Sequence, residues 1–408
     1  MLNKLFKNIG PGTLVAAAFI GPGTVTLCTL AGVHFGTHLL WAMLLSIFAT
    51  ITLQEMAARL GIISQRGLSE VLRSELKEPI LRGFMIFLIL SAIVIGNAAY
   101  EAGNISGSVI GIESITGSFS IKFGTFSLNF FSILIGLIAF GLLLIGNYKV
   151  LEKVLVILVL LMSISFVITA VITKPSLSAI LKGVFLPTIP ENSLFTIMGL
   201  IGTTVVPYNL FLHASLVKEK WKNKEGLTLA KKDTIISILM GGVVSMSIII
   251  SASGISSGTI NNGADLALGL EPLYGSYSKF FLAIGLFAAG VTSSITAPLA
   301  AAFVVKGCLG WKGTMKSIKF KLIWGGILVL GVIFSSIGIK PIEIIKFAQV
   351  ANGVLLPIIV GVLLWIMNKK NVLGKYHNTR LQNFIVLCIL AITIFLGLRS
   401  ILKVFNLL

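Results

Sequence analysis

The chain has 408 residues, of which 56% are hydrophobic and only 11% are charged. Soluble globular proteins carry about 25% charged residues, so this composition excludes a water-soluble enzyme with a polar shell. The high hydrophobic content also excludes an intrinsically disordered chain. A bilayer core about 30 Å thick takes roughly 20 apolar residues per helix. We therefore predict an all-α polytopic membrane protein. No nucleophile–base pair or metal cluster in the sequence supports a membrane enzyme, and no repeated filter motif supports a channel.

Eleven apolar segments of membrane-spanning length follow one another along the chain. They cover residues 12–32, 37–58, 82–107, 126–147, 151–172, 194–217, 233–256, 277–305, 322–339, 343–367 and 382–402. Only short turn-rich or charged connections separate these segments. The pattern predicts eleven transmembrane helices in a single transmembrane domain over residues 1–408, without a large soluble part.

The formal net charge is +18, from 32 Lys and Arg against 14 Asp and Glu. Most basic residues fall in alternate connections, on the side that includes the N-terminus. Cytoplasmic loops collect Lys and Arg, so we predict a cell-membrane protein with its N-terminus in the cytoplasm and its C-terminus outside. Topology and contact with the lipid bilayer explain the charge, which leaves no role for nucleic acid. The three cysteines are scattered, so no metal centre or other cofactor is predicted.

Two of the segments contain a helix-breaking sequence near the middle of the membrane. The first segment has Gly-Pro-Gly-Thr at 21–24, and the sixth has Val-Val-Pro-Tyr at 205–208. Proline removes a backbone donor, and freed backbone groups are tolerated at membrane depth only inside protein or along a cavity. We expect both segments to unwind at these residues and to face each other across a midplane cavity.

The two breaks occupy matching places in a five-plus-five arrangement. Because five is odd, the second half enters the membrane in the opposite sense, which is typical of inverted repeats that hold a substrate between discontinuous helices. The repeats would cover about residues 12–172 and 194–367, with an extra helix near 382–402. The alternative is that these prolines only kink packed helices, as we expect of Pro298 and Pro357.

Three stretches carry a resemblance to a known family. They are residues 10–24 (GPGTLVAAAFIGPGT), 53–61 (LQEMAARLG) and 202–213 (GTTVVPYNLFLH). They resemble the first, second and sixth helices of the Nramp family (natural resistance-associated macrophage proteins) of proton-coupled divalent-metal transporters. The resemblance implies the LeuT-type fold, with ten helices in two inverted repeats plus one extra helix. It also implies a secondary transporter that works by alternating access.

The chain departs from the family where the resemblance places the metal. The family's first-helix motif Asp-Pro-Gly-Asn is Gly-Pro-Gly-Thr here, and its sixth-helix motif Met-Pro-His-Asn is Val-Pro-Tyr-Asn, at 206–209. The family's tenth-helix glutamine falls at Leu355. A divalent cation in a low-dielectric site needs oxygen or sulfur ligands, preferably with negative charge. The sequence therefore disfavours transition metals.

We accordingly predict symport of a small anion such as bicarbonate, because half-helix N-termini attract anions. The predicted substrate-binding residues are Gly21, Gly23, Thr24, Asn104, Thr203, Val206, Tyr208, Asn209 and Asn352. The alternative is a divalent metal cation, Mg²⁺ or Mn²⁺, with or without proton coupling, because a hydrated ion such as Mg²⁺ needs few direct ligands. In either case the partner is a small inorganic ion, and we expect a monomer.

Two ionisable residues within the spans are candidates for coupling. Glu101 matches a glutamate on the family's proton route, and His213 matches a histidine of its sixth helix. Intramembrane carboxylates are costly and usually functional. The alternatives are a protonated carboxyl bonded to its neighbours and a packed, hydrogen-bonded histidine. Glu55 and Arg59, four residues apart in the second span, are expected to form a structural ion pair.

Overall fold

The computed structural model describes residues 20–123, 126–146, 149–255 and 260–405, and nearly all of them are helical. The helices are α3 (Pro22–Phe35), α4 (Leu40–Ser64), α5 (Leu68–Glu75), α6 (Pro79–Thr116), α7 (Phe130–Ile145), α8 (Lys149–Ile172), α9 (Leu177–Phe185), α10 (Leu194–Thr204), α11 (Pro207–Lys220), α12 (Gly226–Ala252), α13 (Gly263–Ala267), α14 (Glu271–Tyr274), α15 (Ser278–Leu309), α16 (Ile318–Ser336), α17 (Pro341–Met367), α18 (Lys370–Leu373) and α19 (Arg380–Val404). One antiparallel hairpin, β1 (Ser120–Phe123) with β2 (Phe126–Asn129), joins α6 to α7. The all-α prediction is confirmed for the helical bundle, but the hairpin was not predicted, and β2 takes up the start of the predicted span 126–147.

Nine helical segments in the described part of the chain are long and apolar enough to cross a membrane. They match every predicted span except the first and the fourth. The fourth corresponds to α7, which has 16 residues and is shorter than a full crossing. The first is represented by α3 alone, because residues 12–19 lie outside the described residues. The number of eleven membrane helices therefore stays a prediction.

The prolines of the spans fall into two groups. Pro22, Pro207 and Pro341 each stand at the start of a helix, where the missing N–H would have no partner in any case. Pro298 and Pro357 lie inside α15 and α17, which continue through them. The prolines of the two predicted breaks thus belong to the first group, and the two expected to sit in packed helices belong to the second.

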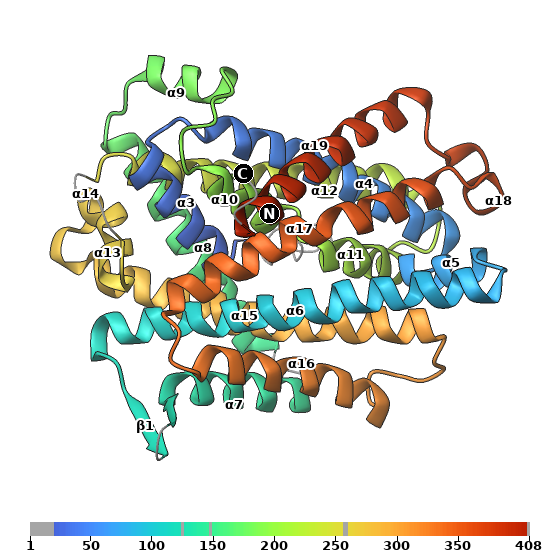
Figure 1. Ribbon diagram of the computed structural model, residues 1–408, viewed down its shortest axis with the longest axis horizontal. Coiled ribbons are helices and arrows are strands. Elements are labelled where there is room, and N and C mark those ends of the chain that lie inside the picture. The colour runs from blue at the N-terminus through green and yellow to red at the C-terminus, as the bar shows by residue number, and fades with distance from the viewer. Residues whose placement is uncertain (1–19, 124–125, 147–148, 256–259, 406–408) are drawn as a thin grey trace.

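Helices α6 and α15 form the centre of the fold. They run side by side along the long axis of the molecule (Figure 1) and make more extensive contact than any other pair of elements. Glycine makes this closeness possible, because a Cβ atom on Gly290 of α15 would collide with Ser108 of α6. On another face of α6, a Cβ atom on Gly107 would collide with Pro22. Helix α6 is therefore held against α15 on one side and against α3 on another.

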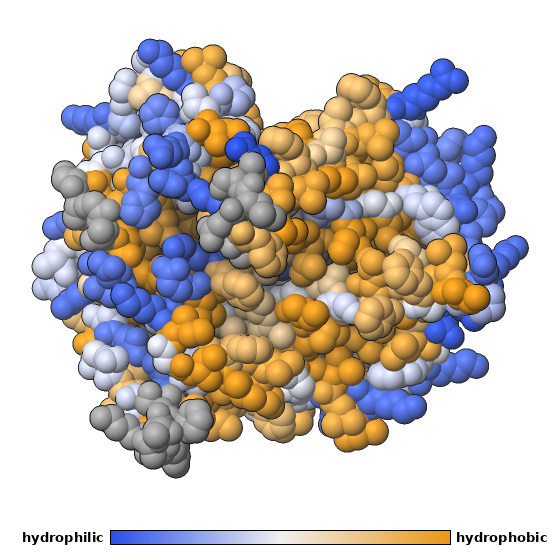
Figure 2. Space-filling model, in the orientation of Figure 1, coloured by the Kyte–Doolittle hydropathy of each residue, from blue (hydrophilic) through white to orange (hydrophobic). Residues whose placement is uncertain are grey.

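The surface has the pattern of a protein that lies in a bilayer. Figure 2 shows apolar residues over the middle of the molecule and hydrophilic residues gathered at its two ends. Large apolar side chains such as Phe48, Phe87, Leu137 and Phe384 are exposed on membrane-length helices and on α7. Lipid tails are the solvent that makes such exposure favourable. The structure is thus that of a multi-pass membrane protein.

Candidate functional site

The sixth span is interrupted between α10 and α11. Helix α10 ends at Thr204 and α11 begins at Pro207, with Val206 in an extended conformation between them (φ −76°, ψ 119°). Pro207 has no N–H, so the carbonyl of Thr203 cannot receive the usual helical bond from the residue four places on. The predicted break is confirmed, but it is shorter than expected. Pro207 and Tyr208 are helical because proline fits the first turn of a helix.

In the first span, helix α3 starts at the predicted place. Gly21 is extended (φ −98°, ψ −176°) and immediately precedes α3, which starts at Pro22. Gly23 and Thr24 were expected to be unwound, and here the prediction was wrong, since both lie in the first turn of α3. The physical reason is the same as in the sixth span. Proline is compatible with the start of a helix, so the irregular backbone ends where the proline stands.

The start of α3 and the end of α10 meet in the interior of the molecule. The hydroxyl oxygens of Thr24 and Thr203 are 2.8 Å apart and both side chains are buried, which joins the start of α3 to the end of α10. Gly202 lies directly against α17, where a Cβ atom would collide with the backbone of Gln349 and approach that of Gly353. Three helices thus converge on one buried region, as the predicted midplane site requires.

Gln349 is the residue that sequence reasoning missed in this region. Its side chain is buried against Gly23, where a Cβ atom would collide with its amide group. Among the described residues, Gln349 Oε1 has no hydrogen-bond partner. Leu355, expected at the place of the family's glutamine, instead packs near Gly96 of α6. The available signal was the pair Gln349 and Asn352, two amides one turn apart in an otherwise apolar span.

Helix α11 presents two polar residues directly after the break. The ring of Tyr208 meets the ring of Tyr100 from α6 edge to face, with centroids 5.4 Å apart. Neither end of the Asn209 side-chain amide has a partner in the part of the chain that the structure describes, although the residue is buried. Val206, between the two helices, is also buried. Asn352 of α17 likewise leaves its Nδ2 atom without a partner there.

Glu101 and Asn104 lie on a different face of α6. Asn104 Nδ2 donates to Glu101 Oε2 at 3.4 Å, and the Ser294 hydroxyl of α15 is close to the same carboxyl group. One turn away, Asn97 Nδ2 donates to the carbonyl of Ala297 on α15 at 3.0 Å. Asn104, predicted to bind substrate, is therefore placed with the coupling candidate Glu101 along the contact with α15. Within the described residues, Glu101 Oε1 has no hydrogen-bond partner.

His213 connects α11 to α4. Its Nδ1 atom is 2.8 Å from Gln54 Oε1, and the side chain is buried. This is the packed, hydrogen-bonded environment that was the alternative to a coupling role. The expected ion pair of Glu55 and Arg59 is confirmed at 3.2 Å, and Arg59 also donates to the carbonyl of Tyr376 at 2.9 Å.

The groups around the breaks are neutral. Within the described ranges, no three His, Cys, Asp or Glu side chains come close enough to hold a metal ion. The sulfur of Met43 lies near the end of α10, 3.6 Å from the Thr204 hydroxyl, whose closer acceptor is the carbonyl of Leu200 at 2.9 Å. The site therefore offers hydroxyl and amide groups, and it can bind a cargo through hydrogen bonds and neutral oxygen atoms.

A multi-pass helical bundle whose interrupted sixth span meets the start of α3 in its interior is typical of a membrane transporter. Residues 12–403 match the family described as natural resistance-associated macrophage protein-like. The chain belongs to the Nramp family. It is a transporter and not an enzyme.

Known proteins of this kind resemble the chain over almost its whole length. The divalent metal cation transporter MntH of Staphylococcus saprophyticus is 27% identical, over 99% of this chain and 93% of its own. The metal transporter nramp1 homolog of Dictyostelium discoideum is also 27% identical, over 96% of this chain and 74% of its own.

Solved structures share the fold. The Eremococcus coleocola manganese transporter superposes with a TM-score of 0.77 at 20% identity, covering 97% of this chain and 86% of that one. Mhp1, a nucleobase-cation-symport-1 family transporter, superposes with a TM-score of 0.54 at 15% identity, covering 97% and 93%. The expected LeuT-type transporter fold is confirmed.

The prediction of bicarbonate symport is wrong. The chain belongs to the Nramp family, and the similar proteins above are named for divalent metal cations or metals. The family's carboxylate and thioether ligands are absent from this chain, and we inferred from their absence that the transported ion is an anion. That inference was the error. Those losses remove direct ligands for a bare ion, but they leave groups that can bind an ion through its water.

Proposed function

We propose that this chain carries a divalent metal cation across the cell membrane by alternating access, and that it prefers a hard, strongly hydrated ion of the Mg²⁺ type. Membership of the Nramp family and the names of the similar proteins support a divalent cation. The observation that carries the choice among cations is the donor set at the breaks. It consists of hydroxyl and amide groups from α3, α10, α11 and α17.

The chemistry of these donors suits a hydrated ion. Mg²⁺ prefers oxygen ligands, loses water reluctantly and is usually bound with several waters in place. Transition metals gain more from sulfur and imidazole ligands. Val206, which stands at the break, offers neither sulfur nor imidazole. The unpaired atoms of Asn209 and Gln349 are placed to bond to the water that the ion retains.

We propose the architecture that goes with this function. The inverted repeats cover about residues 12–172 and 194–367, and the helix near 382–402 is an addition. The close approach of α3 and α10 through Thr24 and Thr203 supports this pairing of the two halves. The distribution of Lys and Arg supports a cytoplasmic N-terminus and an external C-terminus.

Glu101 and His213 have indirect roles in this proposal. Glu101 lies with Asn104 on the α15 face of α6, so we propose that its protonation acts on the pH dependence of transport without direct contact with the cargo. His213 holds α11 to α4 through Gln54. Replacing Glu101→Gln is expected to flatten the dependence of cation uptake on pH. An unchanged pH profile would remove Glu101 from this role.

Purified protein in liposomes that contain a Mg²⁺-sensitive dye tests the proposed cargo. We expect saturable uptake of Mg²⁺ and weaker uptake of Mn²⁺ under the same conditions. Gly21→Asp adds a carboxylate at the first break, where the extended backbone accepts any residue. We expect it to strengthen the apparent affinity for both cations about tenfold, because ionised acceptors bind more strongly than neutral ones.

Gly21→Asn is the matched control for Gly21→Asp. It has nearly the same size and lacks the charge, so we expect a much smaller change in apparent affinity. Absence of uptake of either cation by the wild-type protein would overturn the proposed function. Stronger uptake of Mn²⁺ than of Mg²⁺ would overturn the preference for a hydrated ion.

A further inference from the structure

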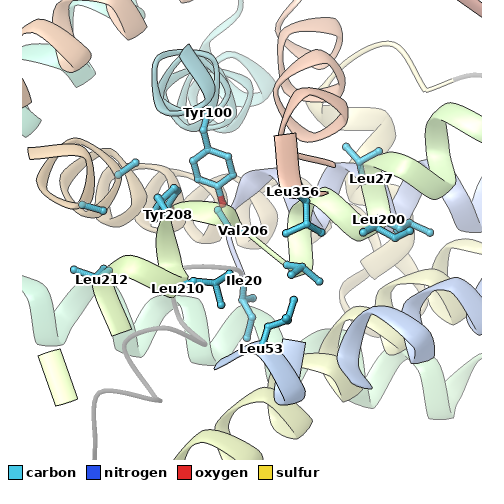
Figure 3. Packing of buried hydrophobic residues seen from close by; sticks show 14 of the residues in the cluster. Ile20, Leu27, Leu53, Tyr100, Leu200, Val206, Tyr208, Leu210, Leu212 and Leu356 are labelled. Carbon is cyan, nitrogen blue, oxygen red and sulfur yellow. The ribbon is translucent and has the colours of Figure 1, made fainter. Parts of the chain in front are cut away.

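Two tyrosines meet beside the break between α10 and α11. Tyr208 is the second residue of α11, and Tyr100 lies near the middle of α6. Their ring planes are inclined at 71°, and both side chains are buried. Figure 3 shows Tyr100 extending from α6 with its hydroxyl directed toward Val206. Edge-to-face packing of two rigid rings therefore fixes a phenol group next to the interrupted backbone.

Tyr100 is the one large side chain in a row of glycines. Gly96, Tyr100, Gly103 and Gly107 are spaced by three or four residues and so lie on one face of α6. Gly96 and Gly103 pack against α17, and Gly107 packs against Pro22 of α3. Helix α6 therefore lies close to α17 and α3 at the glycines of this row. The ring of Tyr100, which stands between these glycines, fills the space beside the breaks. Its ring therefore sets the width of the site on the α6 side.

The hydroxyl of Tyr208 is buried beside the side chains of Tyr100 and Thr296. Among the described residues, none makes a hydrogen bond of good geometry with its oxygen. A buried hydroxyl without a partner is costly, and such a group in a native protein calls for an explanation such as water or an ion. Asn209, the next residue, leaves its amide unpaired as well. A phenol both donates and accepts hydrogen bonds, so it suits a water molecule better than a bare metal ion.

We propose that Tyr100 and Tyr208 determine specificity by binding the hydration shell of the cation. This inference rests on the proposed function, because it takes a divalent cation as the cargo. Mg²⁺ keeps several waters, whereas Ca²⁺ takes about six to eight oxygen ligands in flexible geometry. Two rigid phenol groups beside the break favour the ion that arrives with its water. The preference for Mg²⁺ over Ca²⁺ thus resides in these hydroxyls.

The substitutions Tyr100→Phe and Tyr208→Phe test this inference, because each keeps the ring and removes the hydroxyl alone. Mg²⁺ uptake into liposomes is measured over a range of Mg²⁺ concentrations, with Ca²⁺ as a competitor. Each variant is expected to raise the apparent KM for Mg²⁺ about tenfold, to leave the maximal rate nearly unchanged and to let Ca²⁺ compete more strongly. Tyr277→Phe is the control, since Tyr277 is 67% exposed.

Wild-type values of both KM and Ca²⁺ competition in both variants would overturn this inference and leave the proposed function standing. Absence of divalent-cation uptake by the wild-type protein would overturn both. Thermal unfolding in detergent checks that the variants are folded. We expect Tyr208→Phe to unfold no earlier than the wild type, because the hydroxyl that it loses has no partner among the described residues.

Discussion

Buried polar groups differ in their hydrogen bonding between two regions of the molecule. One region is the site around the two predicted breaks, and the other is the end of the molecule that carries α5 and α18. At midplane, the buried polar atoms of Tyr208, Asn209 and Gln349 have no partner among the described residues. At the α5–α18 end, both terminal nitrogens of Arg59 bond to groups on α4 and on the segment before α19, although its Nε has no partner among the described residues. The comparison indicates that one region holds the helices in place, and under the proposed function the cargo completes the other.

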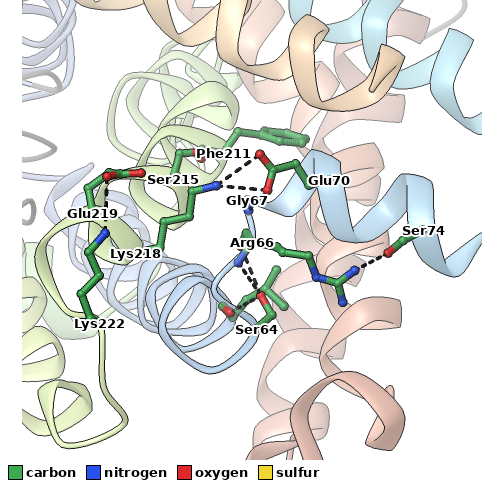
Figure 4. Close-up of polar contacts among 11 residues, drawn as sticks. Ser64, Arg66, Gly67, Glu70, Ser74, Phe211, Ser215, Lys218, Glu219 and Lys222 are labelled. Carbon is green, nitrogen blue, oxygen red and sulfur yellow. Dashed lines mark hydrogen bonds and ion pairs between the residues drawn. The ribbon is translucent and has the colours of Figure 1, made fainter. Parts of the chain in front are cut away.

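Glu70 illustrates the paired end most clearly. Its carboxylate accepts the backbone N–H of Gly67 at 2.9 Å, which caps the start of α5. The same carboxylate lies 3.0 Å from Lys218 Nζ in the last turn of α11. Figure 4 shows both contacts, together with the bond between Arg66 and Ser74 in the last turn of α5. One side chain thus shapes a short helix and ties it to the second half of the interrupted span.

The largest expected effect is that of Arg59→Ala at the paired end. The change removes the partner of Glu55 and leaves the carbonyl of Tyr376 without its donor. Breaking a buried pair from one side costs about 3–5 kcal/mol, and chemical unfolding in detergent measures it. Arg66→Ala is the control, because its bond to Ser74 is exposed. Equal losses in the two variants would contradict the distinction between the two regions.

A smaller loss is expected from Gly202→Ala at the wall of the midplane site. The new Cβ atom would meet the backbone of Gln349 and Gly353 on α17, and backbone atoms cannot rotate away. Overpacking of this kind costs about 1–3 kcal/mol, measured by thermal unfolding. Gly361→Ala, on α17 with open space around its Cβ position, is expected to have no such cost. Wild-type stability of Gly202→Ala would show that the wall is not rigid.

Asn209→Ala separates stability from transport. Its amide has no partner in the described structure, so we expect the free energy of unfolding to change by less than about 0.5 kcal/mol. The apparent affinity for Mg²⁺ is expected to fall about tenfold, as measured by uptake into liposomes. Asn378→Ala is the reverse control, because Asn378 accepts from Arg59 at 2.9 Å and should lose stability. Destabilisation by Asn209→Ala would mean that this amide holds the fold.

The smallest effect is expected from the pair of Lys218 and Glu70. Because the pair is partly exposed, Lys218→Ala should cost only about 0.2–1 kcal/mol. Glu70→Ala should cost more, since it also removes the cap from Gly67. Unfolding of the two single variants and the double variant, at low and high salt, measures the coupling. A coupling energy that does not fall with salt would argue against an ion pair.

Much of the fold could be predicted from composition and from two prolines. The spacing of apolar segments identified the membrane helices, and Pro207 identified the break between α10 and α11. The ion pair of Glu55 and Arg59 was also predictable, because a spacing of four residues places both on one helix face. Such features depend on local sequence, and local sequence was enough to find them.

The parts that could not be predicted depend on how distant helices approach one another. Gln349 reaches the site because α17 packs directly against Gly23, and nothing near Gln349 in sequence encodes that contact. Asn104 faces Glu101 and α15 because of the rotation of α6, which an apolar pattern does not determine. The cargo was mispredicted because the prediction considered only direct protein ligands, which are missing. It did not consider the water molecules that a hydrated ion retains.

Helix α11 is also long enough that a small rotation at its start displaces its far end by several ångströms. From Pro207 to Lys218 it measures about 17 Å at 1.5 Å per residue, and its pivot is the non-helical link at Val205 and Val206. A rotation of about 10° at this link displaces the far end by about 3 Å, which is as long as the contact between Lys218 and Glu70. A rotation of this size must therefore either break the contact between Lys218 and Glu70 or move α5 together with α11.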